Sequence, residues 1–393
     1  MTRPLLIIFL TIFVNLVGFG IIIPLLPFYA ETFGASPVVI GLLFAVFSLC
    51  QLIAAPVLGD LSDRHGRRPV LMFSLAGTVV SFVMLAVAHS VWMLFAARIV
   101  DGLSGGNIST ARAYVADVTE PKDRARAYGL IGAAFGLGFI LGPALSGVLA
   151  GISYTAPIWA AAAITLVATV MTWWWLPETV HRARAGTGNP LNYVPALLRR
   201  PPLRRVLTID FFYWLAFAIF QTTLSLFAAR RFGFGPVQTG YMFAAFGLLG
   251  AVIQGGLIRP IVHRLGDKPT FVVGLVSGAL GLAAVALAHS VAAFAIALVP
   301  LAIGIGFGHP TMATLVSLVA RADEQGRVQG AASAVESLGR TIGPVWGNAS
   351  LQHFGESSPY FSAAALLLVT LSLTVGFHVA DADPIAAEIA RGH

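Results

Sequence analysis

The sequence predicts an all-α membrane protein in which twelve transmembrane helices form two pseudo-symmetric six-helix bundles. Of its 393 residues, 57% are hydrophobic and only 10% are charged, whereas a soluble domain carries about a quarter charged residues. Twelve apolar segments each approach the roughly 20 residues that a helix needs to cross a bilayer. The two halves of the chain also share features at a nearly constant spacing, which indicates a duplicated unit.

The twelve spans are expected at residues 5–27, 39–59, 70–88, 91–116, 127–150, 155–176, 206–229, 236–258, 270–288, 291–319, 328–351 and 358–379. The first begins like a signal peptide, but it is too long and no A-x-A site follows it, so an uncleaved helix is expected. The predicted domains are an N-terminal six-helix bundle (1–176), a cytoplasmic linker (177–205), a C-terminal six-helix bundle (206–379) and a cytoplasmic tail (380–393).

The basic residues predict the orientation in the membrane. Nineteen of the 24 lysines and arginines fall on the side that holds the N-terminus, and only Arg230 and Arg231 fall in loops on the other side. By the positive-inside rule, both termini are expected in the cytoplasm, and the expected location is the cell inner (plasma) membrane. The net charge of +7 then serves orientation, so nucleic acid is not an expected partner.

An internal repeat links the two halves. Arg64-x-Gly66-x-x-Pro69 recurs as Arg264-x-Gly266-x-x-Pro269, and Ala88-His89-Ser90-Val91 recurs 200 residues later as Ala288-His289-Ser290-Val291. Duplicated units are typical of secondary transporters, which expose a site at the repeat interface alternately to either side. Because no glycine-rich phosphate loop ending in lysine is present, ATP-driven transport by this chain is not expected.

A charged loop lies between the second and third spans. It reads Gly59-Asp60-Leu61-Ser62-Asp63-Arg64-His65-Gly66-Arg67-Arg68. Such a loop can latch neighbouring helices through charge pairs and helix-terminus dipoles. It can also serve orientation alone, and composition by itself favours that simpler role.

This loop closely resembles the loop signature of the major facilitator superfamily, and the resemblance extends over the twelve spans and the linker. It implies that Gly59 permits close packing of spans two and eleven. Asp63 would sit at the start of span eleven and stabilise the outward-facing state, and Arg67 and Arg68 would pair with acids such as Asp117. The second copy has His263 in place of the acid and Asp267 in place of an arginine, so a latch is not expected there.

Glycines and a proline mark span five, at Gly129, Gly138, Gly142, Pro143 and Gly147. Glycines on one helix face permit backbone contact with a neighbouring helix, and proline bends a membrane helix. By pattern alone this is a packing surface. The motif also resembles the span-five signature of the drug:proton antiporter branches of the superfamily, with Ser146 where glycine is usual.

Ionisable residues inside the spans are the proton-coupling candidates, because a charge in a bilayer is costly and is usually functional. Arg98 and Asp101 in span four are three residues apart, and Glu336 and Arg340 in span eleven are four apart, so each pair shares a helix face. A static ion pair is the alternative in both cases. Two weaker candidates are Asp210, expected to touch water near the membrane surface, and His309, which could instead be a packed histidine.

Span one resembles the first helix of the tetracycline-efflux type of drug:proton antiporter. However, Asn15 stands where those exporters carry an acid, and Gly250 and Gly278 stand where they carry a histidine and an acid. The drug-recognition and proton set of those exporters is therefore absent. Spans one, four, seven and ten line the cavity in the superfamily, which makes these residues the candidate cavity lining: Asn15, Phe19, Asn107, Tyr213, Trp214, Phe217 and Gln221.

The predicted function is secondary active transport, namely proton-coupled efflux of hydrophobic or cationic drug-like molecules by alternating access. Proton-coupled uptake of a sugar or organic metabolite is the alternative, and a membrane-embedded enzyme or a non-transporting sensor is disfavoured. The expected partners are a small-molecule substrate, protons and the lipid bilayer, and the chain is expected to act as a monomer. No catalytic residue, cofactor or metal is expected, and Cys50 is the only cysteine.

Overall fold

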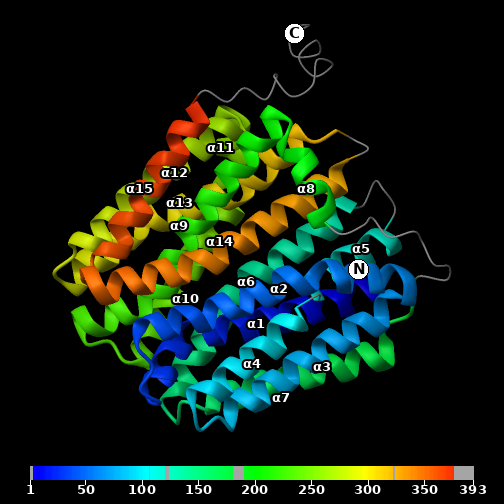
Figure 1. Cartoon of the computed structure of the whole chain (residues 1–393), viewed down its shortest axis with the longest axis horizontal. Coiled ribbons are helices and arrows are strands. Elements are labelled where there is room, and N and C mark those ends of the chain that lie inside the picture. Colours follow the sequence, from blue (N-terminus) through cyan, green and yellow to red (C-terminus); the bar gives the residue numbers. More distant parts are fainter. Residues whose placement is uncertain (1–2, 106, 120–123, 180–189, 322–323, 376–393) are drawn as a thin grey trace, which may run out of the picture. The chain divides into compact units, whose positions relative to one another are not determined.

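A computed structural model describes residues 3–105, 107–119, 124–179, 190–321 and 324–375. In these residues all of the regular secondary structure is helical (Figure 1). The chain divides into two compact units, residues 1–186 with 224–248 and residues 187–223 with 249–393. Each unit is described separately below.

The helices of the first six predicted spans are α1 (Arg3–Glu31), α2 (Pro37–His65), α3 (Arg67–Ala86), α4 (Val91–Leu103), α5 (Asn107–Val118), α6 (Arg124–Ala150) and α7 (Ala156–Trp175). Those that follow are α8 (Pro190–Leu198), α9 (Pro201–Phe232), α10 (Pro236–Val252), the π-helical turn η2 (Ile253–Leu257), α11 (Ile258–Leu265), α12 (Asp267–Leu287), α13 (Val291–Val319), α14 (Gln325–Phe354) and α15 (Ser358–Val375). Each predicted span coincides with one of these helices or with an interrupted helix. Within the described residues, nine helices are long and apolar enough to cross a membrane.

Two expectations about the elements need correction. Span four is not one continuous helix, because α4 ends at Leu103 and a turn at Ser104 and Gly105 precedes α5. The Gly105 backbone N–H turns back to the Gly102 carbonyl, and glycine-rich sequence readily leaves a helix. The predicted linker 177–205 is also partly helical, since it contains α8 and the start of α9. The predicted tail 380–393 lies outside the described residues.

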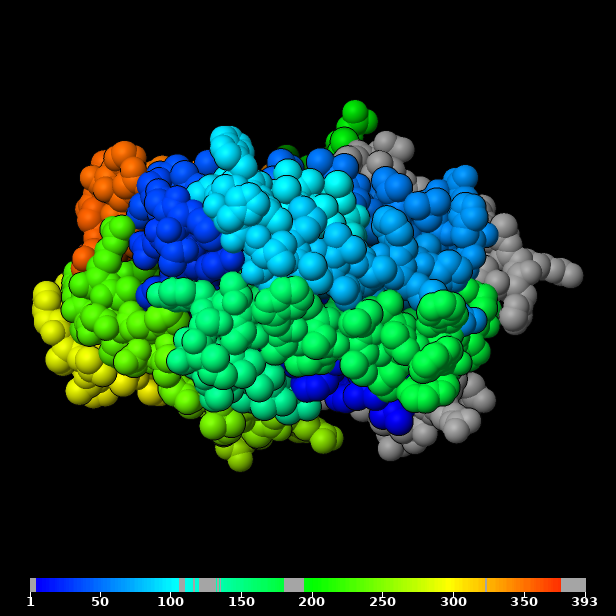
Figure 2. Space-filling view, turned by 90° about the horizontal axis from the view of Figure 1, so that it is seen from below, coloured from blue at the N-terminus to red at the C-terminus, as the bar shows by residue number. Residues whose placement is uncertain are grey.

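In the first unit, α1 packs extensively on α6 and α7, and α3 packs on α7 and α4. Ile8 and Ile12 of α1 and Tyr114 and Val115 of α5 belong to one buried cluster in this unit. Figure 2 shows the face to which α3, α4 and α7 contribute. Large apolar side chains are exposed on these helices, with Trp92 80% exposed and Trp174 71% exposed. Exposed apolar surface on that scale fits contact with lipid.

The span-five glycines bring α6 directly against its neighbours. A Cβ added to Gly142 would lie 2.6 Å from the Val17 carbonyl oxygen of α1, and one added to Gly138 would lie 2.6 Å from the Leu16 Cβ. Gly147 meets Gly240 of α10 in the same way. Pro143 lies within α6 as well, and the surroundings of Gly129 are outside the described residues. The packing interpretation is therefore confirmed for Gly138, Gly142 and Gly147.

The second unit repeats this packing. A Cβ added to Gly339 of α14 would lie 3.0 Å from the Leu215 backbone nitrogen of α9, and one added to Gly343 would lie 2.9 Å from the Leu215 carbonyl oxygen. The same pair of helices in each half thus approaches through glycines at equivalent repeat positions. The duplication visible in the sequence is a duplication of helix packing.

Glycines with positive φ also recur in both halves, at Gly34 and Gly233 and at Gly66 and Gly266. The first pair is 199 residues apart and the second pair is 200 residues apart, so one residue is added between them. The regular helix α2 has 29 residues, and its counterpart Pro236–Leu265 has 30. The wide turn η2 lies in this counterpart and accommodates the additional residue, since a π-turn takes one residue more than an α-turn.

Candidate functional site

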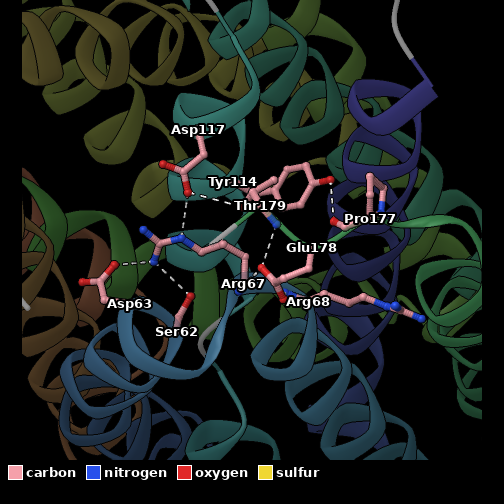
Figure 3. A network of polar contacts seen from close by, with 9 residues as sticks. All are labelled: Ser62, Asp63, Arg67, Arg68, Tyr114, Asp117, Pro177, Glu178 and Thr179. Carbon is pink, nitrogen blue, oxygen red and sulfur yellow. Dashed lines mark hydrogen bonds and ion pairs between the residues drawn. The ribbon is translucent and has the colours of Figure 1, made fainter. Parts of the chain in front are cut away.

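The guanidinium of Arg67 is the centre of the predicted latch loop (Figure 3). Its Nη1 atom contacts the Asp63 carboxylate at 2.6 Å and donates to the Ser62 hydroxyl at 3.0 Å. Its Nε atom donates to the Asp117 carboxylate at 3.1 Å. The Arg67 side chain is only 8% exposed. The expected contact of Arg67 with Asp117 is therefore present, and it joins the start of α3 to the end of α5.

Glu178, which the sequence interpretation did not include, caps the start of α3. Its carboxylate accepts the backbone N–H groups of Arg67 at 2.9 Å and Arg68 at 3.1 Å (Figure 3). These N–H groups have no partner within the helix, and a negative charge at this end of a helix is stabilising. A Cβ on Gly66 would collide with the same carboxylate. Glu178 thus fastens the end of α7 to the loop.

Among the remaining loop residues, Arg68 differs from the expectation. The Arg68 guanidinium donates to the Trp173 carbonyl oxygen, whereas an acidic partner was expected. Arg64 pairs with Asp60 at 2.9 Å, but both side chains are exposed, so this pair contributes little. A Cβ added to Gly59 would meet no described atom within 4 Å. Packing inside its own unit therefore does not require glycine at position 59.

A polar hollow in the first unit contains the span-four pair. Arg98 Nη1 donates to the Asp101 carboxylate at 3.0 Å, and Arg98 is only 1% exposed. The Thr78 side chain adds a hydrogen bond to Asp101. Asn15 and Phe19 line the same hollow. The structure therefore brings together two of the predicted cavity residues and one of the two predicted ion pairs.

A second group of charges lies in the second unit, between α9 and α14. Asp210 is buried, with 1% exposure, so the expectation that it touches water is wrong. It interacts electrostatically with Glu336 and Arg340 and accepts a hydrogen bond from the Trp214 side chain. Arg340 in turn interacts with both carboxylates. Three of the six predicted proton-coupling residues therefore form one cluster.

Aromatic rings from α9 surround His309 of α13. The His309 ring stacks on Trp214, with centroids 4.7 Å apart, and meets Phe217 edge-on at 4.7 Å. Arg340 also contacts this aromatic group, with its Cζ atom 5.1 Å from the Trp214 centroid. Tyr213 and Phe217 line an apolar hollow beside Gly278, the position where a tetracycline-efflux acid was aligned. Two of the predicted cavity-lining residues, Tyr213 and Phe217, therefore line this hollow.

The structure does not place two other cavity candidates beside either hollow. Gln221 is buried on α9, and the side chain of Asn107 lies outside the described residues. Within the described part of the chain, no three histidine, cysteine, aspartate or glutamate side chains are grouped so as to hold a metal ion.

An ion pair outside the spans fastens the start of α9 to the start of α14. Arg200 Nη1 contacts the two Glu324 carboxylate oxygens at 2.6 and 2.7 Å. The Arg321 backbone N–H also donates to Glu324 at 3.1 Å. Burial raises the pKa of Glu324, but these hydrogen bonds outweigh burial, so its pKa lies below the ordinary value. The pair joins the end of the predicted linker to α14, which carries Glu336 and Arg340.

Residues 8–344 match the Major Facilitator Superfamily. The chain is 33% identical to the tetracycline resistance protein, class C, of Escherichia coli over 87% of this chain and 88% of that protein. It is 31% identical to multidrug resistance protein 2 of Bacillus subtilis over 93% and 92% of the two chains. The crystal structure of the human organic anion transporter MFSD10 is similar with a TM-score of 0.75, at 26% identity, over 95% of this chain and 99% of that one.

Proposed function

The chain belongs to the Major Facilitator Superfamily and is a multi-pass membrane transporter, and on this premise we propose that it exports hydrophobic or cationic drug-like molecules in exchange for protons. Relatives at about 30% identity are named tetracycline resistance and multidrug resistance proteins, which supports efflux. We also propose that both termini are cytoplasmic, that the membrane is the cell inner membrane and that the chain acts as a monomer.

The observation that carries the proposal is the group of ionisable side chains in the second unit. Asp210 and Glu336 interact with each other and with the guanidinium of Arg340. Asp210 is buried, with 1% exposure, and a charge in such surroundings is costly. A proton on one carboxylate, or a cationic group of a substrate, changes the charge of this group. The same cluster can therefore exchange a proton for a substrate.

The pair in the first unit has one carboxylate and one guanidinium. Asp101 already has a guanidinium and a threonine side chain as partners, so its negative charge is compensated. We therefore place Asp210 and Glu336 ahead of Asp101 as proton carriers. Arg340 would stabilise the deprotonated cluster, and Arg98 would do the same for Asp101.

The aromatic residues beside the cluster support an apolar substrate. Trp214, Phe217 and the His309 ring pack together next to Arg340. Aromatic walls with a few polar groups bind amphipathic ligands, because flat rings bury large area and the polar groups set orientation. In the proposed cycle, the two halves alternate between two states, and the loop around Arg67 stabilises one of them.

The test uses purified protein in liposomes that contain a pH-sensitive dye. A pH gradient is imposed, and a panel of lipophilic cations, antibiotics, sugars and organic acids is added while proton movement is recorded. Efflux by antiport predicts that a drug-like compound moves protons opposite to itself. Asp210→Asn and Glu336→Gln should abolish this movement. Glu356→Gln, in the turn between α14 and α15, is the matched carboxylate control and should leave it intact.

The direction of flux separates the two transport mechanisms. Movement of protons in the same direction as a sugar or acid would establish symport and refute the antiport proposal. Proton-coupled flux that persists in Asp210→Asn, Glu336→Gln and Asp101→Asn would refute the assignment of the carriers.

A further inference from the structure

The guanidinium of Arg98 is engaged along one side only. Nη1 donates to Asp101 at 3.0 Å, whereas the Nε and Nη2 atoms are buried and have no acceptor in the described part of the chain. Nε–H and one Nη2–H point in the same direction and form the two-pronged edge that matches a carboxylate. A buried donor without an acceptor is costly. The edge is therefore formed but has no protein partner in the described residues.

The hollow that Arg98 helps to line combines polar and aromatic groups, although the Nε and Nη2 atoms themselves are covered in this structure. Asn15, Gln51 and Thr78 line the hollow together with Arg98, and so do Phe19 and Phe82. The aromatic ring of Phe47 lies 4.1 Å from the Arg98 Cζ atom, and that residue also lines the hollow. A ring stacked on a guanidinium holds its plane fixed, so the free edge keeps one direction. Such a hollow suits a ligand with an anionic head and a flat apolar body.

The second unit provides an internal comparison. There, two protein carboxylates, Asp210 and Glu336, interact with the guanidinium of Arg340. In the first unit, Asp101 is the carboxylate among the residues that line the hollow with Arg98. By this comparison, the Arg98 guanidinium can pair with one further carboxylate, and its Nε and Nη2 atoms can donate the hydrogen bonds.

We propose that the ligand supplies this carboxylate, so that the Arg98 hollow binds the anionic head of an amphipathic organic acid or zwitterion. This inference rests on the proposed export function and extends its substrate class to amphipathic molecules that carry an anionic oxygen. Arg98 would bind the ligand carboxylate through Nε and Nη2 while Nη1 keeps Asp101. A cationic compound without an anionic oxygen leaves the edge unpaired and binds more weakly at this hollow.

Matched probes test the inference on the full-length protein in detergent. Aromatic carboxylates of one, two and three rings are each compared with the methyl ester and the primary amine of the same skeleton, and affinities are measured by titration calorimetry. At least one carboxylate should bind about tenfold or more tightly than its ester, as expected for a charged, bidentate contact. Arg98→Lys keeps the charge but removes the planar edge, so it should abolish the preference. Arg112→Lys, at an exposed arginine of α5, should retain it.

Equal affinities of acid and ester throughout the panel, binding by no carboxylate, or a preference that survives Arg98→Lys would overturn the inference. If Arg98→Lys does not fold, the acid and ester pairs on the wild-type protein still decide. Because these measurements need no proton gradient, a loss of proton coupling in the liposome assay would leave the carboxylate preference unaffected. The two proposals can thus fail separately.

Discussion

The Glu178 carboxylate accepts the backbone N–H of Arg67 over 2.9 Å, although 111 residues separate the two in sequence. The Arg67 side chain at the same time contacts Asp63 and Asp117. The backbone and side chain of one residue therefore join the α2–α3 loop to the ends of α5 and α7. A change at either residue should be felt in the stability of the first unit.

Glu178→Gln should lower the thermal stability of the purified protein. The amide can still accept a hydrogen bond, but it loses the negative charge at the start of α3, which is worth about 1 kcal/mol. Asp60→Asn is the control, because its pair with Arg64 is exposed and contributes little. Equal unfolding midpoints for the two variants would contradict the capping role.

Gly66→Ala should destabilise the protein more than Gly266→Ala does. Both glycines have positive φ, at +106° and +86°, so both variants carry backbone strain of about 1 kcal/mol or more. Only at Gly66 does the new Cβ meet a carboxylate, since the nearest atom at Gly266 is 3.9 Å away. The difference between the two unfolding midpoints isolates the collision with Glu178. A larger effect at Gly266 would show that the collision is relieved.

Gly142→Ala should destabilise the first unit by about 1–3 kcal/mol, because the new methyl group separates α6 from α1. Gly136→Ala lies in the same helix, and its Cβ would meet no described atom within 4 Å. That variant should be neutral or stabilising by up to about 1 kcal/mol, since alanine is the better helix former. Chemical or thermal unfolding of both variants in one detergent checks this. A stabilising Gly142→Ala would exclude close packing at this position.

The contact of Arg200 with Glu324 should make stability depend on pH. The pKa of Glu324 is lowered by its hydrogen bonds, so its contribution is fully present above the ordinary glutamate pKa of 4.5. It is lost as the pH falls through the lower, folded-state pKa. Glu324→Gln should therefore be less stable than the wild type at pH 7, and the gap should close in acid. Unfolding midpoints between pH 7 and about pH 3.5 test this, and a gap that is constant with pH would contradict it.

The sequence predicted the helices and the local pairs well. The twelve spans follow from apolar length, and the contact of Arg98 with Asp101 follows from a spacing of three residues on one helix. The glycine spacing predicts that one face of α6 packs closely on a neighbouring helix. It does not identify that neighbour as α1.

The rest depends on tertiary structure. Glu178 has partners 110 and 111 residues away, and no periodicity connects them. Its one signal in the sequence is a carboxylate two residues after the predicted span 155–176, where a helix start in a neighbouring loop can use it. Asp210 was expected near water because depth was judged from its position in the span, whereas neighbouring helices decide its burial.

The wide turn η2 marks a difference in length between the two halves. Because the glycine pairs on either side of it are offset by 199 and 200 residues, the second half holds one residue more than the first between these positions. Most insertions in a helix would rotate everything downstream by about 100°. A π-turn takes up one residue more than an α-turn, so η2 lets the second half differ in length from the first within one interrupted helix.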